Sequence, residues 1–209
     1  MKNHISNIKT FVENRLTDIL TNSHRPLKED EISVTEVTLC LKKAFLDRKY
    51  GWLPVTPVMQ KLVFGIGFHK AISSTINNSE KEYRKNVKDY TLVGIPDAII
   101  NRTIYEWKTV QRLPPVPLHH HVAQVSLYMW LTELDTAYIV YFTPKGYRNY
   151  FRVKYGQSVM KVIDRMLQRG DHLHKCIVKQ TPPEEEYSWE CENCPYVTQF
   201  CIGEEVAKV

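Results

Sequence analysis

The segment IPDAIINRTIYEWKTV places three charged side chains on two runs of otherwise apolar residues. Asn101 and Arg102 separate the two runs, which predicts two short strands joined by a tight turn. A desolvated charge costs several kcal/mol unless a partner or a metal compensates for it, and a whole domain is stable by only about 5–15 kcal/mol. Asp97, Glu106 and Lys108 therefore either face solvent or form a site.

The alternation of side chains along a strand places Glu106 and Lys108 on one face and Trp107 on the other. Asp97 lies nine positions before Glu106, and the turn would bring the two carboxylates side by side. Close carboxylates repel, so the pKa of one rises unless a cation such as Mg²⁺ or Mn²⁺ lies between them. The alternative is a solvated Asp at a bend with an exposed Glu-x-Lys pair on an edge strand.

The chain is long and apolar enough for one sizeable core. Its 209 residues are 43% hydrophobic, which suits one domain or one domain with a small appendage. The longest apolar runs are too short to span a membrane, and the N-terminal MKNHISNIKT lacks the apolar segment of a signal peptide. We therefore expect a soluble, cytoplasmic protein, and its net charge of +5 is compatible with an anionic partner without requiring one.

Hydrophobic periodicity predicts an α/β fold in which helices pack on a sheet. Ser33 and Glu36 have the spacing of a capping box and predict the start of a helix. Helices are expected at 5–20, 33–50, 56–76, from about 118, and 156–168, and strands as a meander of three within 81–110, then at 136–144 and 147–155. The segment from Gln180 onward is rich in proline, acid and cysteine, which predicts a separate small element.

Three further side chains lie where a site could use them but also have ordinary roles. His69 follows FGIGF in the third helix, and a histidine in such a place commonly forms a hydrogen bond at the edge of a core. Gln124 and Tyr128 lie four residues apart, so they share one face of the helix after the hairpin. A solvated Gln and an amphipathic Tyr are the ordinary interpretation.

The order of these motifs resembles the RecB-type branch of the PD-(D/E)xK nuclease superfamily. The motifs are Gly65-x-x-x-His69, Gly94-x-x-Asp97, Glu106-x-Lys108 and Gln124-x-x-x-Tyr128. The resemblance implies a restriction-endonuclease-like core, which is a mixed sheet flanked by helices. It also implies that His69, Asp97, Glu106 and the main-chain carbonyl of Trp107 hold Mg²⁺ or Mn²⁺.

Lys108, Gln124 and Tyr128 complete, with Asp97 and Glu106, the catalytic set that the resemblance implies. Lys108 would orient or help activate the attacking water and stabilise negative charge on the phosphate. Gln124 and Tyr128 would position Lys108 or the DNA backbone. These residue types suit phosphodiester hydrolysis, which needs an activated water and neutralised charge at phosphorus.

Three of the five cysteines cluster near the C-terminus as Cys191-x2-Cys194-x6-Cys201. The odd count and the absence of a secretory signal disfavour a disulfide scaffold and favour metal or cluster ligation. A tetrahedral metal or a cubane cluster needs a fourth thiolate, for which Cys40 is the preferred candidate and Cys176 the competitor. The spacing by itself leaves an Fe–S cluster and a Zn(Cys)₄ site both open.

The chain has one cysteine before the nuclease motifs and a cluster of three after them. This arrangement resembles that of the RecB-like nucleases that include AddB and the Cas-four family of CRISPR-associated exonucleases. The chain resembles this group from Cys40 to Cys201, and its length is similar to that of stand-alone Cas-four proteins. The resemblance implies that Cys40, Cys191, Cys194 and Cys201 bind a [4Fe-4S] cluster. The expected parts are an N-terminal helical region at 1–55 that contributes one cluster cysteine, a RecB-like nuclease domain at 56–180 and a C-terminal Fe–S element at 181–209.

The resemblance further implies a metal-dependent DNA exonuclease that acts on single-stranded DNA ends. In this interpretation the protein processes spacer precursors for the Cas-one and Cas-two integrase during CRISPR adaptation. Two alternatives stay open. One is an Fe–S DNA-binding adaptor subunit with a vestigial nuclease site, and the other is a zinc-stabilised RecB-like nuclease of DNA repair or of a virus.

Basic and aromatic residues alternate in two further segments and offer a path for a DNA strand. Basic side chains neutralise phosphates, and aromatic rings stack on unpaired bases. The residues are Lys42, Lys43, Phe45, Arg48, Lys49 and Tyr50 in the first segment and Lys81, Tyr83, Arg84, Lys85, Lys88 and Tyr90 in the second. For each of them the alternative is a solvated surface of mixed charge. His119, His120 and His121 at a helix start could contact phosphate or cap the helix.

Overall fold

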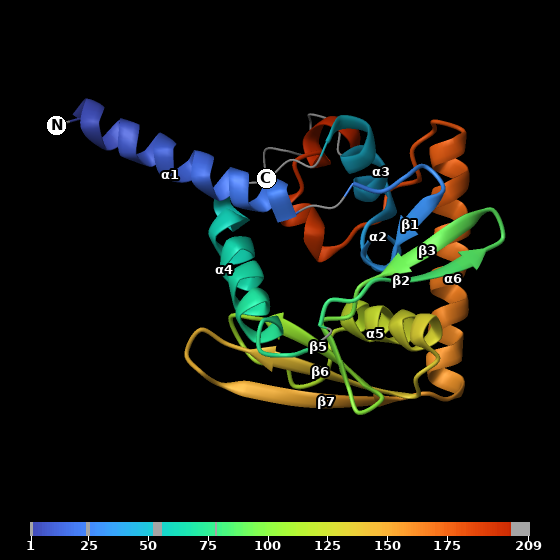
Figure 1. The fold of residues 1–209 in the computed structure, drawn as a ribbon. Coiled ribbons are helices and arrows are strands. Elements are labelled where there is room, and N and C mark those ends of the chain that lie inside the picture. Colours follow the sequence, from blue (N-terminus) through green and yellow to red (C-terminus); the bar gives the residue numbers. More distant parts are fainter. Residues whose placement is uncertain (1, 24–25, 52–55, 78, 202–209) are drawn as a thin grey trace.

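The fold is an arrangement of helices around two small β-sheets, seen in a computed structural model that describes residues 2–23, 26–51, 56–77 and 79–201 (Figure 1). The α-helices are α1 (Lys2–Ser23), α2 (Val34–Thr38), α3 (Leu41–Tyr50), α4 (Thr56–Ser73), α5 (His119–Thr132) and α6 (Gln157–Val178). The strands are β1 (Glu31–Ser33), β2 (Tyr83–Val87), β3 (Tyr90–Gly94), β4 (Ala98–Ile100), β5 (Thr103–Thr109), β6 (Thr136–Phe142) and β7 (Arg148–Lys154). The short helices η1 (Trp189–Asn193) and η2 (Val197–Cys201) follow. The predicted α/β class with mixed sheets and flanking helices is confirmed.

The strands form two sheets, so the expectation of one sheet with a three-stranded meander is wrong. One sheet has the order β1-β3-β2 and the other β4-β5-β6-β7, and each contains one parallel pair. The apolar run that suggested one long strand is interrupted after Gly94, because Pro96 has no N–H to continue the ladder. The three-residue strand β1 was not predicted, since it is too short to show a period.

The hairpin of β4 and β5 has the predicted turn. Asn101 and Arg102 both have positive φ, 48° and 60°, as a two-residue turn that matches the twist of the strands requires. Register pairs Ala98 with Tyr105 and Ile100 with Thr103. Asp97, just before β4, therefore lies next to the β5 segment that contains Glu106.

The helix predicted over 33–50 is in fact two helices. The capping box of Ser33 and Glu36 starts α2 as predicted, with Glu36 accepting from the Ser33 N–H at 2.7 Å. The backbone is extended at Leu39, which ends α2. Cys40 then caps α3, because its Sγ accepts from the Lys43 N–H at 3.5 Å. The last helix, α6, is longer than predicted and continues to Val178.

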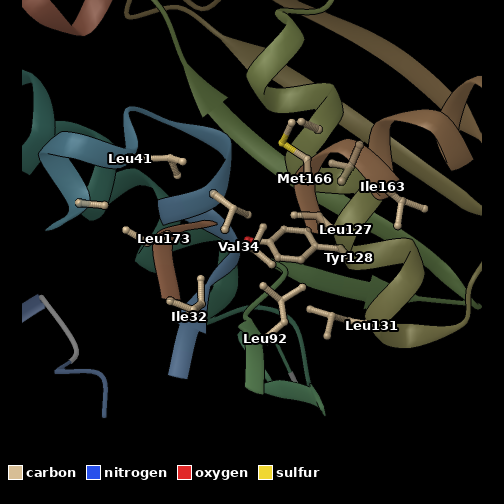
Figure 2. Packing of buried hydrophobic residues seen from close by; sticks show 14 of the residues in the cluster. Ile32, Val34, Leu41, Leu92, Leu127, Tyr128, Leu131, Ile163, Met166 and Leu173 are labelled. Atoms are coloured by element: carbon tan, nitrogen blue, oxygen red, sulfur yellow. The ribbon is translucent and has the colours of Figure 1, made fainter. Parts of the chain in front are cut away.

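The main hydrophobic core lies around α5, which contacts both sheets and α6. Figure 2 shows Tyr128 of α5 surrounded by apolar side chains from α2, β1, β3 and α6. Labelled members of this cluster are Ile32, Val34, Leu92, Leu127, Leu131, Ile163, Met166 and Leu173. Helix α1 extends away from this body and contacts α4 (Figure 1). Within the described part of the chain, no helix combines the length and the apolar character needed to cross a membrane.

A second, smaller core covers the other face of the β4–β7 sheet. Trp107 packs there with Ala98 and Val140, and Ile72 and Ile76 lie against them. This confirms that the ring of Trp107 points away from the face that carries Glu106. The face of the sheet that carries Glu106 and Lys108 therefore lies toward α5.

Candidate active site

Asp97 is fixed at the bend between the two sheets by a hydrogen bond across the hairpin. Its Oδ2 accepts from the main-chain N–H of Trp107 at 2.7 Å, and the residue is 8% exposed. The hairpin thus brings Asp97 and the strand that carries Glu106 together, as the sequence predicted. A carboxylate in this position is oriented by main chain, so its direction does not depend on a flexible partner.

Glu106 lies deeper and is 2% exposed. Its Oε1 accepts from Lys108 Nζ at 2.8 Å, whereas its Oε2 has no hydrogen-bond partner among the described residues. Burial raises the pKa of Glu106, the nearby Asp97 carboxylate adds to this, and the Lys108 ammonium opposes it. A buried carboxylate oxygen without a donor is costly, so it calls for a ligand or a function.

His69 reaches the same carboxylates from α4. Its Nδ1 lies 3.2 Å from Asp97 Oδ1. Burial alone would lower the pKa of His69, but the hydrogen bond to Asp97 and the Asp97 charge outweigh burial and raise it. Gly65, one turn before His69, allows α4 to approach β5 closely, because a Cβ there would lie 3.1 Å from Thr109 Oγ1.

Gln124 and Tyr128 approach from α5 and bond to one another. Gln124 Nε2 donates to the Tyr128 hydroxyl at 2.9 Å. Burial raises the pKa of Tyr128 well above its usual value, and the carboxylates of Glu106 and Asp97 raise it further. The Tyr128 phenol is therefore a neutral donor close to both carboxylates.

The donor set of this region suits a hard divalent cation, although the described side chains are paired with one another. Within the described residues no three His, Cys, Asp or Glu side chains form a group that could hold a metal ion. Both oxygens of Asp97 have protein partners, His69 and the Trp107 N–H, and Lys108 occupies one oxygen of Glu106. Only Glu106 Oε2 among these carboxylate oxygens is unpartnered. Carboxylates and one imidazole are ligand types that Mg²⁺ or Mn²⁺ accepts, so the chemistry of these side chains suits such an ion although the described side chains are not arranged around one.

The clustered cysteines share a second region, a cavity between the N-terminal helices and the C-terminal element. Cys40, Cys191, Cys194 and Cys201 line this cavity, which we call the thiol pocket. Burial raises the pKa of the Cys40, Cys194 and Cys201 thiols. Cys176 is not among the lining residues, and its sulfur lies 3.8 Å from His172 Nε2 on α6. Thiolates are ligands of both Fe–S clusters and zinc, so the residue types suit either group, although the described thiols are not arranged as a closed metal site.

Polar contacts between distant segments hold the walls of the thiol pocket. Glu190 Oε2 accepts from the Cys40 N–H at 2.8 Å. Arg169 of α6 donates to both oxygens of Glu186, at 2.6 and 2.8 Å, and also to two main-chain carbonyls at the end of α2. Lys42 Nζ donates to the Phe200 carbonyl at 2.6 Å. Local sequence patterns do not predict these pairs, because the partners lie far apart along the chain.

The basic and aromatic segments proposed as a DNA path are partly buried and partly paired with other residues of the protein. Phe45 and Tyr90 are each 3% exposed and belong to the core. Arg48 donates to Glu36 at 2.6 and 2.8 Å, and Lys85 donates to Glu133 at 3.0 Å. Much of this charge is thus used in intramolecular ion pairs, and the interpretation as a surface of mixed charge holds for these residues.

The histidines at the start of α5 lie near the carboxylate site. His121 Nδ1 is 2.8 Å from the Tyr141 hydroxyl, which also accepts from the Leu118 N–H at 3.0 Å. Burial lowers the pKa of His121 to about 2, and the charges of Lys108 and His120 contribute. His121 is therefore a neutral structural residue at physiological pH, and it is not a phosphate-binding cation.

Comparison with known proteins shows one related sequence and two informative solved structures. No family model matches the chain. CRISPR-associated exonuclease Cas4 of Saccharolobus solfataricus is 26% identical over 184 residues, which cover 80% of this chain and 85% of that protein. The crystal structure of SSO0001 superposes with a TM-score of 0.65 at 20% identity, covering 90% of this chain and 93% of the other. A structure from Eubacterium rectale, of a protein proposed to be an exonuclease, gives 0.54 at 8% identity and covers 89% of this chain and all of its own.

The two structural matches show a shared fold, and the sequence similarity to CRISPR-associated exonuclease Cas4 extends over most of both chains. Together they confirm the resemblance to the Cas-four family that the order of motifs indicated.

Proposed function

We propose, from the confirmed resemblance to CRISPR-associated exonuclease Cas4, that this chain is a divalent-metal-dependent exonuclease that acts on single-stranded DNA ends. One observation carries the proposal. The buried Glu106, near Asp97, His69 and Lys108, keeps one oxygen to which none of the described residues donates. A purely structural ion pair would satisfy its buried oxygens, whereas a site prepared for a cation leaves one available.

His69, Asp97, Glu106 and the main-chain carbonyl of Trp107 would hold Mg²⁺ or Mn²⁺. The bound ion would supply an activated water and neutralise charge at the phosphate. Lys108 is positioned on the same strand face as Glu106, so its ammonium can orient the attacking water and donate to a phosphate oxygen.

Tyr128 and Gln124 of α5 pack beside the carboxylates of Glu106 and Asp97. The buried, neutral phenol lies close to Glu106 and Asp97, and Gln124 fixes its hydroxyl direction. Gly94 permits this approach, because a Cβ there would lie 2.9 Å from the Tyr128 ring. Two motifs that are far apart in sequence thereby act as one packing unit in a restriction-endonuclease-like core.

We assign the thiol pocket to a [4Fe-4S] cluster ligated by Cys40, Cys191, Cys194 and Cys201. The position of all four residues at one cavity supports the assignment, and so does the absence of Cys176 from its lining. The cluster would join the C-terminal element, 181–209, to the N-terminal region, 1–55, across the nuclease domain, 56–180. Its role is structural, as in other folds that depend on a metal.

The substrate and partners follow from the same resemblance. Spacer precursors with single-stranded ends are the proposed substrate, and the Cas-one and Cas-two integrase is the proposed partner. An integration assay with that integrase would test this role. Precursors that this protein has trimmed should integrate, and untrimmed precursors should not.

The nuclease proposal is tested with labelled single-stranded DNA, Mg²⁺ or Mn²⁺, and the variants Asp97→Ala and Lys108→Ala. Lys154→Ala is the matched control, because this exposed lysine lies on β7 away from the carboxylates. We expect the control to cleave like the wild type and both site variants to lose at least about 100-fold in rate. Equal degradation by all four proteins would disprove the assignment, and DNA binding without cleavage would favour the adaptor.

The cluster proposal is tested by comparing Cys40→Ser with Cys176→Ser after anaerobic purification. Iron content and visible absorption should be lost in the first variant and kept in the second. A colourless wild type that contains zinc and no iron would establish the zinc-stabilised alternative instead.

A further inference from the structure

An exposed aromatic side chain links the thiol pocket to the candidate active site. Trp189, the first residue of η1, is 65% exposed, and its ring centroid lies 5.2 Å from that of His120 on α5. The centroid of the His120 ring in turn lies 4.1 Å from that of His121, which bonds to Tyr141 of β6. A large indole half out in water needs an explanation, because it buries only part of its apolar surface.

The indole lies on the side of the protein where the reaction is proposed to occur. His121, the neighbour of His120, bonds to Tyr141, and Tyr141 pairs with Lys108 across β5 and β6. Burial lowers the pKa of His120, and the Lys108 ammonium lowers it further. His120 is consequently neutral at physiological pH. Trp189 and His120 therefore present flat, uncharged rings close to the lysine that is proposed to contact phosphate.

The surroundings of Trp189 suit a base better than a phosphate. Val116 is 64% exposed, Leu118 is 37% exposed and Tyr187 is 78% exposed, so apolar surface is available on the neighbouring segments. The same C-terminal element carries Glu190, and acidic residues precede and follow it. Negative charge repels a phosphate, whereas every nucleobase has a face that can stack on an aromatic ring.

We propose that Trp189, backed by His120, is a stacking platform for an unpaired nucleobase of the strand whose phosphate lies at Lys108. This inference rests on the proposed nuclease function and specifies how its site selects single-stranded DNA. A base inside a duplex is covered on both faces by its stacked neighbours, so the platform favours a base that is unstacked from the rest of the strand. Base-specific hydrogen bonding is not needed, and the platform is indifferent to sequence.

The thiol pocket holds the platform in place. Trp189 lies between Ser188, whose hydroxyl accepts from the Glu190 N–H at 3.2 Å, and Glu190, whose carboxylate accepts from the Cys40 N–H at 2.8 Å. Cys191 lies two residues further on and lines the pocket. Ligation of the four thiols would fix the main chain on both sides of the indole. Trp189 is thus a positioning residue whose orientation depends on the pocket.

The test measures binding of a fluorescent oligothymidylate to the full-length holoprotein by anisotropy, in EDTA so that no cleavage occurs. The variants are Trp189→Ala and Trp189→Phe, and Tyr147→Ala is the matched control because Tyr147 is also 65% exposed but follows β6. A second probe is a strand of the same length with abasic sites in place of its bases. Thermal unfolding followed by circular dichroism checks that each variant is folded.

We expect Trp189→Ala to bind oligothymidylate about tenfold more weakly than the wild type, and Trp189→Phe to stay within about threefold, because one stacked base is lost in the first and kept in the second. The abasic strand should show the same affinity for all four proteins. The platform is wrong if Trp189→Ala and wild type bind oligothymidylate equally, or if the loss is as large with the abasic strand.

Cleavage rates separate this inference from the proposed function. If wild type and Trp189→Ala cut single strands with equal kcat/KM, the nuclease assignment stands and the platform fails. If the binding difference is found but neither protein cleaves with Mg²⁺ or Mn²⁺, the platform stands and the nuclease assignment fails. A raised KM with little change in kcat is the expected result for a residue that holds the strand without touching the reacting phosphate.

Discussion

Replacing Glu106 by Gln should make the metal-free protein more stable at alkaline pH. Burial raises the pKa of this carboxyl from 4.5 to about 7. The folded protein therefore keeps a proton at pH values where the unfolded chain has lost it, so stability falls as pH rises from about 4.5 to 7. At about 1.36 kcal/mol per pKa unit, the full loss above pH 7 is about 3 kcal/mol. Gln has similar volume and no charge to desolvate, so it escapes this loss.

The assay is urea unfolding of wild type and Glu106→Gln in EDTA from pH 4 to pH 8.5. The free energy of unfolding of the variant, relative to wild type, should grow by about 3 kcal/mol across this range. Other titrating groups, such as His69 and His121, are present in both proteins and largely cancel in the difference. Addition of Mg²⁺ at pH 8 should stabilise the wild type and leave the variant unchanged. A difference that is the same at pH 5 and pH 8 would refute the reasoning that Glu106 is a desolvated carboxylate.

Three further predictions concern the parts that support the site. Gly94→Ala should lower the free energy of unfolding by about 1–3 kcal/mol in urea titrations, because the added Cβ would lie 2.6 to 2.9 Å from three core side chains. The control is Gly67→Ala, which should not destabilise the protein, because an added Cβ there would meet nothing within 4 Å. Arg169→Lys should cost about 2 kcal/mol by the same measurement, since a lysine cannot reproduce the paired bonds to Glu186 and the carbonyls of α2; equal stability would contradict this. Tyr128→Phe should reduce kcat by roughly tenfold and change the free energy of unfolding by about 1 kcal/mol. A loss of kcat that is only in proportion to the loss of unfolding free energy would indicate that the Tyr128 hydroxyl is purely structural.

The local features that the sequence predicted follow from short-range rules. The capping box at Ser33, the turn at Asn101 and Arg102, and the shared face of Gln124 and Tyr128 each depend on residues within four positions of one another. Such contacts are fixed by backbone geometry and are largely independent of the rest of the fold. That the Trp107 side chain lies on the opposite face of β5 from Glu106 follows from strand alternation in the same way.

The failures of prediction come from competition between local pattern and long-range packing. The apolar spacing across 33–50 is compatible with one helix, but α2 ends at Thr38 and Cys40 caps α3, where Glu190 of the C-terminal element accepts from the Cys40 N–H. The aromatic and basic segments alternate as a DNA-binding surface would, yet Phe45 and Tyr90 are buried by neighbours that the local sequence does not reveal. The only sign of Trp189 in the sequence is its place two positions before a clustered cysteine, and that spacing does not reveal the contact with His120.

The sequence by itself determined the α/β class, the hairpin turn and the order of the motifs, since these depend on side-chain type and on short spacings along the chain. Only the tertiary structure decided that Glu106 is buried with an oxygen left without a donor, that Cys40 and not Cys176 lines the thiol pocket, and that the indole of Trp189 lies against His120. The physical reason is that burial and desolvation are properties of the packed whole. A carboxylate, a thiol or an indole has the same chemistry anywhere in the chain, and its surroundings decide whether that chemistry is available for function.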